Sequence, residues 1–105
     1  MAAMGVFMAR KMLAVVVTTE HRGVFFGYVP MGTDLDVETV RIADARMCVY
    51  WSADARGVLG LAANGPNSGC KIGPKVPAIT LRKVTAIIEV SDEATALWEK
   101  APWNR

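Results

Sequence analysis

The chain has 105 residues, 52% of them hydrophobic and 21% charged, with a formal net charge of +2. This length suits a single domain, and the composition excludes a disordered tail, a collagen-like fibre and a coiled coil. The longest apolar run, Met12 to Val17, is much shorter than the roughly 20 residues of a membrane-spanning helix, so we expect no membrane partner. Twelve basic and ten acidic residues are spread along the chain, which argues against a nucleic-acid partner.

The pattern divides the chain into an N-terminal extension, residues 1–11, and a single globular domain, residues 12–105. Within the extension, apolar side chains recur every three to four positions, as one helical face requires: Met1, Met4, Phe7 and Met8. Two interpretations stay open, a leader ahead of a later start or an arm that packs on a neighbouring subunit. No small-residue cleavage site of a signal peptide follows the short apolar run, so we expect a cytoplasmic protein.

The first part of the domain predicts a β-hairpin. Residues 12–19 are rich in β-branched side chains and predict a buried strand. A polar break over residues 20–23 predicts a turn, and residues 23–29 predict the returning strand. Gly27 inside that strand indicates a bulge or the close approach of another backbone.

Two further strands are predicted over residues 37–43 and 46–51, with a turn or a bulge at residues 44–45 between them. In the second of these, side chains alternate between two faces. One face carries Arg46 and Tyr50 and the other is apolar.

The second half of the domain predicts a short helix over residues 55–63, ended by Asn64-Gly65 and Pro66. A long loop follows, and residues 76–82 and 84–90 then predict two strands or one long bent strand. Ser91 caps a C-terminal helix that Pro102 ends. The expected fold is α+β: a small, mostly antiparallel curved sheet or partly open barrel of about five to six strands, with a short central helix and a C-terminal helix.

The sequence assembles no catalytic or metal-binding set. Cys48 and Cys70 have no further ligand at metal-site spacing, and a disulfide between them requires Cα atoms within about 7 Å. His21 lies in the predicted turn without an identifiable nucleophile beside it. We therefore expect a protein that is not an enzyme and that holds no cofactor and no metal.

The most informative cluster lies where a strand ends beside the start of a helix. Arginine and aromatic side chains offer stacking surface and donors at little entropic cost, and a helix N-terminus favours anions. Tyr50 is predicted to face the site, Trp51 to be buried and the Ser52 hydroxyl to point outward. The predicted binding residues are Arg46, Tyr50, Trp51, Ser52 and, from the long loop, Lys71.

Several segments resemble a family of small, uncharacterised proteins encoded by bacteriophages and prophages. The resemblance depends on Gly-Val-Phe-Phe-Gly-Tyr, Asp-Ala-Arg leading to Tyr-Trp, Leu-Gly-Leu-Ala-x-x-Gly, Val-Pro-Ala-Ile-Thr-Leu, Ala-Ile-Ile-Glu-Val and the Pro-Trp pair at Pro102 and Trp103. Asp44 stands where we expect Asn. The resemblance implies a phage or prophage accessory protein and no established catalytic residues.

Two functions remain open. One is a binding protein, such as a counter-defence factor that engages a host protein or sequesters a small, anionic, nucleotide-like signal. The other is a virion or assembly component. In both cases the high apolar content of so small a chain favours a homo-oligomer, and the expected location is the cytoplasm of the bacterial host.

Overall fold

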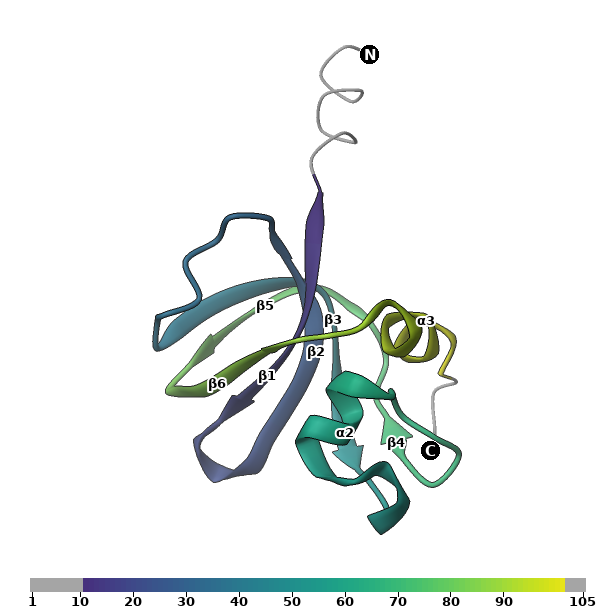
Figure 1. Cartoon of the computed structure of the whole chain (residues 1–105). Coiled ribbons are helices and arrows are strands. Elements are labelled where there is room, and N and C mark those ends of the chain that lie inside the picture. Colours follow the sequence, from purple (N-terminus) through teal and green to yellow (C-terminus); the bar gives the residue numbers. More distant parts are fainter. Residues whose placement is uncertain (1–10, 102–105) are drawn as a thin grey trace.

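The computed structural model describes residues 11–101, so the expected N-terminal arm lies outside the described residues. The described part contains six strands and two α-helices (Figure 1). Two short 3-10 turns, η1 and η2, complete it. The elements in chain order are β1 (Met12–Thr19), η1 (Glu20–Arg22), β2 (Gly23–Pro30), β3 (Thr39–Tyr50), η2 (Ala53–Ala55), α2 (Gly57–Ala63), β4 (Lys71–Ile72), β5 (Val76–Arg82), β6 (Val84–Glu89) and α3 (Asp92–Lys100).

The strands form one antiparallel sheet in the order β4-β3-β2-β1-β6, and β5 also pairs with β3. Only Lys83 separates β5 from β6, yet β5 pairs with β3 and β6 pairs with β1. One residue can connect these two positions because the sheet is strongly curved, and Lys83 takes the left-handed conformation at φ 56°. The backbone N–H of Glu20 donates to the Lys83 carbonyl at 3.1 Å. The predicted α+β fold with a curved, antiparallel, unclosed sheet is confirmed.

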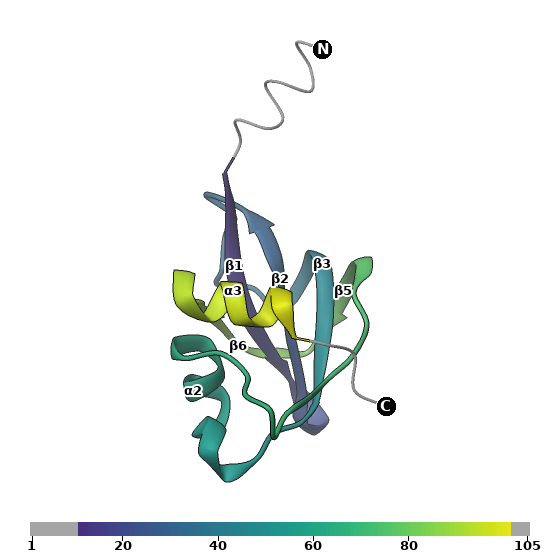
Figure 2. The same cartoon turned by 90° about the vertical axis from the view of Figure 1, so that its right-hand side faces the viewer.

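The central strand β1 is buried on both faces of the sheet. Val15 and Val17 pack into a core on one face with Ile42, while Val16 packs on the other face with Trp98. Both helices cover this second face, and Figure 2 shows α3 lying across β1 and β2 with α2 beside it. Burial on both sides explains why β1 is a continuous apolar run rather than an alternating one.

The two strands predicted over residues 37–51 are one strand, β3, interrupted by a bulge. The partner register changes from Phe26 opposite Arg46 to Tyr28 opposite Ala43, so two residues of β3 oppose Gly27 alone. Asp44 accommodates the bulge with a φ of 49°. The register confirms the bulge, and a Cβ atom at Gly27 would lie 3.0 Å from the Ala43 carbonyl oxygen, which confirms the close approach of another backbone.

The helices agree with the sequence pattern except at the start of α2. The predicted helix over residues 55–63 begins as the 3-10 turn η2, and regular helix starts only at Gly57. The C-terminal helix begins after Ser91, whose Oγ accepts the N–H of Ala94 at 3.0 Å. No helix within residues 11–101 combines the length and apolar character needed to cross a membrane.

Candidate functional site

The Arg46 side chain is buried and bonds separate segments of the domain together. It is 6% exposed, and its Nε donates to the Gly73 carbonyl at 2.8 Å. Its NH1 group donates to the carbonyls of Trp98 at 2.9 Å and Ala101 at 2.8 Å. The last carbonyls of a helix carry partial negative charge, so the guanidinium stabilises the end of α3 and holds it against the sheet. The sequence placed Arg46 beside Tyr50 on a binding face, whereas the structure places it inside the domain.

Tyr50 and Lys71 are the two predicted site residues that the structure brings together at the surface. They are paired across β3 and β4, and Tyr50 is 54% exposed. Trp51 is half-buried and packs against the core beneath α2 and α3. The predicted orientation is therefore confirmed for Tyr50 and in part for Trp51.

The Ser52 hydroxyl points inward, contrary to the prediction. Its Oγ is buried and has no hydrogen-bond partner among the described residues. A Cβ atom built on Gly69 would lie 2.7 Å from this oxygen, so the loop before β4 covers it. The position of Ser52 just after a strand therefore does not expose its hydroxyl, because the loop before β4, which is distant in sequence, folds over it.

An exposed apolar surface lies on the face of β3 opposite Arg46. Met47 and Val49 on β3 are 40% and 58% exposed, and Val76 at the start of β5 is 40% exposed. We call these three residues the β3 patch. They line a hollow of about 320 Å³ whose floor includes the half-buried Phe25 and Ile79.

The sequence pattern indicated that this face is apolar but not that it is exposed. The alternation of Met47 and Val49 with Arg46 and Cys48 was visible, and apolar strand faces usually point into a core. Here the helices cover the Arg46 and Cys48 side instead. The apolar side beyond the bulge is left open to solvent.

A second polar cluster ties β2, α3 and the segment before β5 together. The carboxylate of Glu99 accepts a hydrogen bond from the Tyr28 hydroxyl and contacts Lys75 Nζ at 2.5 Å. Burial alone would raise the pKa of Glu99, but the hydrogen bonds from Lys75 and Tyr28 and the charges of Lys75 and Arg46 outweigh it and lower that pKa. Burial, followed by the bond to Glu99, raises the pKa of Tyr28. Tyr28 therefore stays a hydrogen-bond donor.

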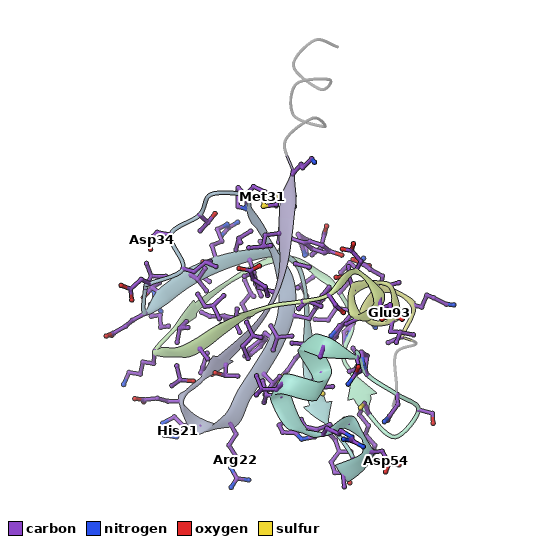
Figure 3. The ribbon with its side chains drawn as sticks, viewed as in Figure 1. His21, Arg22, Met31, Asp34, Asp54 and Glu93 are labelled. Atoms are coloured by element: carbon purple, nitrogen blue, oxygen red, sulfur yellow. The ribbon has the colours of Figure 1, made fainter. Side chains whose placement is uncertain are left out.

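Other reactive side chains are dispersed or inert. Burial raises the pKa of the Cys48 thiol to about 12, as expected for a core thiol. Figure 3 shows Asp34, Asp54 and Glu93 on different sides of the domain, and His21 at the tip of the β1–β2 hairpin. Among residues 11–101, no three His, Cys, Asp or Glu side chains are grouped as metal ligands.

Comparison with known families gives one match. Residues 12–98 match the family model described as Domain of unknown function (DUF6948). The chain belongs to this family. A search of curated proteins and a search of solved structures found no match.

The match to DUF6948 covers the whole curved sheet and most of α3. It includes the β3 patch, Tyr50 and Lys71, and it ends at Trp98, immediately before Glu99. The family supports the expected resemblance to uncharacterised proteins. Its description assigns no activity to any residue of the DUF6948 domain.

The Glu99 cluster predicts a pH-dependent stability. A carboxylate whose folded-state pKa is lowered contributes stability above its unfolded pKa, about 4.3 for Glu. That stability is lost as the pH falls through the lower folded-state value. We therefore expect Glu99→Gln to reduce the melting temperature at pH 7, with a difference from the wild type that becomes smaller as the pH falls below about 4.3.

Thermal unfolding followed by circular dichroism at several pH values measures this effect. Glu89→Gln is the matched control, since Glu89 is an exposed carboxylate on β6. A melting-temperature difference for Glu99→Gln that stays constant from pH 7 to pH 3 would contradict the role assigned to the carboxylate charge.

Proposed function

We propose that this protein is a non-enzymatic binding module and that its β3 patch contacts a protein partner. The observation that carries this proposal is the group of three exposed apolar side chains around a hollow of about 320 Å³. Contiguous exposed apolar surface of this kind marks interaction sites. A hollow lined by apolar side chains accepts an anchoring side chain, the usual centre of an energetic hot spot.

The lining of the hollow favours a protein partner over a small anionic ligand. Among the described residues that line it, Arg46 alone is charged, and its Nε and NH1 groups already donate to three carbonyls. Binding an anion requires hydrogen-bond donors or cations that are not already paired. Binding an apolar side chain requires only an apolar surface to pack against. Exposed Tyr50 follows Val49 at the end of β3 and pairs with exposed Lys71 on β4, so this end of the sheet also carries an aromatic and a charged group.

The wider setting that we propose is a phage or prophage accessory protein that acts in the bacterial cytoplasm on a host protein. A counter-defence factor fits this description. The support is the sequence resemblance described above, together with the open patch. The alternative is a virion or assembly component, and mass spectrometry of purified phage particles distinguishes the two, because only a structural component is present in the particle.

Substitutions on the patch test the proposal directly. We expect Val49→Asp to weaken partner binding at least about tenfold, because a carboxylate in the contact must be desolvated. Val49 is already exposed, so the melting temperature should change little. Leu59→Asp is the matched control, since Leu59 is also apolar and exposed but lies on α2.

The experiment has three steps. Native mass spectrometry of the purified chain gives its oligomeric state and any co-purifying molecule. Proteins retained by the wild type are then compared with those retained by Val49→Asp and Leu59→Asp, and the affinity for the purified candidate is measured. A partner bound equally by all three chains would refute the assignment of the patch.

A second copy of the chain is one specific outcome of this test. In that case light scattering at micromolar concentration gives the mass of a homo-oligomer for the wild type and of a monomer for Val49→Asp. A monomeric wild type would rule out the homo-oligomer.

A further inference from the structure

Strand β6 has one unpaired edge. Within residues 11–101 it pairs with β1 on one side and with no strand on the other, and Figure 1 shows it diverging from β5. Along an antiparallel pair, residues whose backbone groups bond the partner strand alternate with residues whose groups point away. The N–H of Val90 donates to the Ala14 carbonyl at 3.0 Å, so the register directs the backbone groups of Ile87 and Glu89 away from β1.

A hollow of about 300 Å³ lies along this outer edge. It is lined on one side by residues 84–87 of β6 and on the other by residues 35–38 of the loop before β3. The two segments are joined at one end, where the Val84 N–H donates to the Glu38 carbonyl at 2.9 Å. Neighbouring side chains of a strand point to opposite faces, so consecutive strand residues line one hollow where the backbone edge itself borders the space. The edge of β6 is therefore open to an added strand.

Carboxylates flank the open edge. Asp36 and Glu38 on the loop and Glu89 on β6 are exposed, and the described residues that line the hollow include no lysine or arginine. The ammonium of Lys83, which precedes β6, lies 3.9 Å from the carboxylate of Glu20 instead. Like charges that meet across two strands destabilise the pair, so this edge disfavours a second copy of itself and favours a basic segment.

We propose that β6 binds an extended, lysine- or arginine-rich segment of another protein as an added strand. In this mode of recognition, main-chain hydrogen bonds supply the affinity and alternate side chains supply the selectivity. The outward backbone groups of Ile87 and Glu89 bond the added strand, and the carboxylates of Asp36 and Glu38 attract its basic side chains. This surface is separate from the β3 patch, because β2 and β1 lie between β3 and β6 in the sheet.

NMR titration of the ¹⁵N-labelled chain with a synthetic heptapeptide of alternating lysine and valine tests the strand addition. We expect the amide resonances of Ile87 and Glu89 to shift. The same peptide methylated at every backbone nitrogen keeps its charge but donates no backbone hydrogen bond, so it should bind at least about tenfold more weakly. Equal binding of the two peptides, no shift at about 1 mM peptide, or shifts confined to the β3 patch would overturn the proposal. Shifts of the two amides with protein concentration alone would place a second copy there instead.

Substitution of the flanking carboxylates tests the choice of a basic partner. We expect the chain with Asp36→Asn and Glu38→Gln to bind the lysine–valine peptide about threefold more weakly at low salt, the size of effect that two exposed ion pairs have. The chain with Asp54→Asn and Glu93→Gln loses the same charge from exposed positions elsewhere on the domain (Figure 3) and should bind as the wild type does. Equal affinities of these two variants, or equal binding of a glutamate–valine peptide, would rule out a basic partner.

Discussion

Replacing Trp98 by Ala is expected to lower the free energy of unfolding by about 3–5 kcal/mol, as truncation of a fully buried aromatic does. Trp98 is completely buried and stacks on Phe26, with ring centroids 4.9 Å apart and planes 5° from parallel. Its Nε1 donates to the Leu61 carbonyl at 3.0 Å. One side chain thus joins α3 to the sheet and to α2, and urea denaturation followed by circular dichroism measures the loss.

Two further substitutions make this prediction specific. Trp98→Phe keeps most of the apolar contact and loses the hydrogen bond, so a cost of about 1–2 kcal/mol is expected. Trp51→Ala should cost less than Trp98→Ala because Trp51 is only half-buried. The sequence alone predicted Trp51 to be buried. Equal losses for the two alanine variants would contradict the burial described here.

Replacing Arg46 by Met is expected to cost about 3–5 kcal/mol, because it leaves buried carbonyls without their charged donor. The guanidinium bonds Gly73, Trp98 and Ala101 at once. Methionine fills much of the same volume, so the expected loss arises from the unsatisfied carbonyls rather than from a cavity. Urea denaturation at pH 7 measures it.

Arg41→Met is the matched control for Arg46→Met. Arg41 lies on the same strand and is exposed, and within residues 11–101 it makes only a long contact of 3.5 Å to Thr80, so its removal should change stability by less than about 0.5 kcal/mol. Arg46→Lys should be intermediate, because an ammonium cannot reproduce the planar fork of donors. If Arg46→Met is as stable as Arg41→Met, the network does not stabilise the end of α3.

The burial of a substituted side chain decides whether a loss of partner binding reflects the surface or the stability of the domain. A variant of Arg46 that loses a partner loses it through instability, since the side chain is buried. Val49 and Tyr50 are exposed, so their variants report on the surface itself. A melting curve for every variant separates the two cases.

Both helices and all strands except β4, which lies where a long loop was predicted, were predictable from local patterns. The β-branched run of β1, the glycine in β2 and the Ser91 cap of α3 each encode a conformation within a few neighbouring residues. The same holds for Gly27, where an interruption in an otherwise bulky strand indicated the bulge. The exposure of Tyr50 does not follow from alternation, which places Tyr50 on the buried face of Arg46 and Cys48; the register shifts between Cys48 and Tyr50, where the strand ends.

Only the tertiary structure decided which side of β3 is covered. The alternation of side chains along a strand predicts that Cys48 and Val49 point in opposite directions. It does not predict which of the two faces the helices cover. Which face is covered depends on α3, about 50 residues later in the chain. The carbonyls at the end of α3 accept the hydrogen bonds of the buried Arg46 side chain. The same packing leaves Val49 exposed, and so the candidate binding surface arises from contacts between segments too distant in sequence for any local pattern to encode.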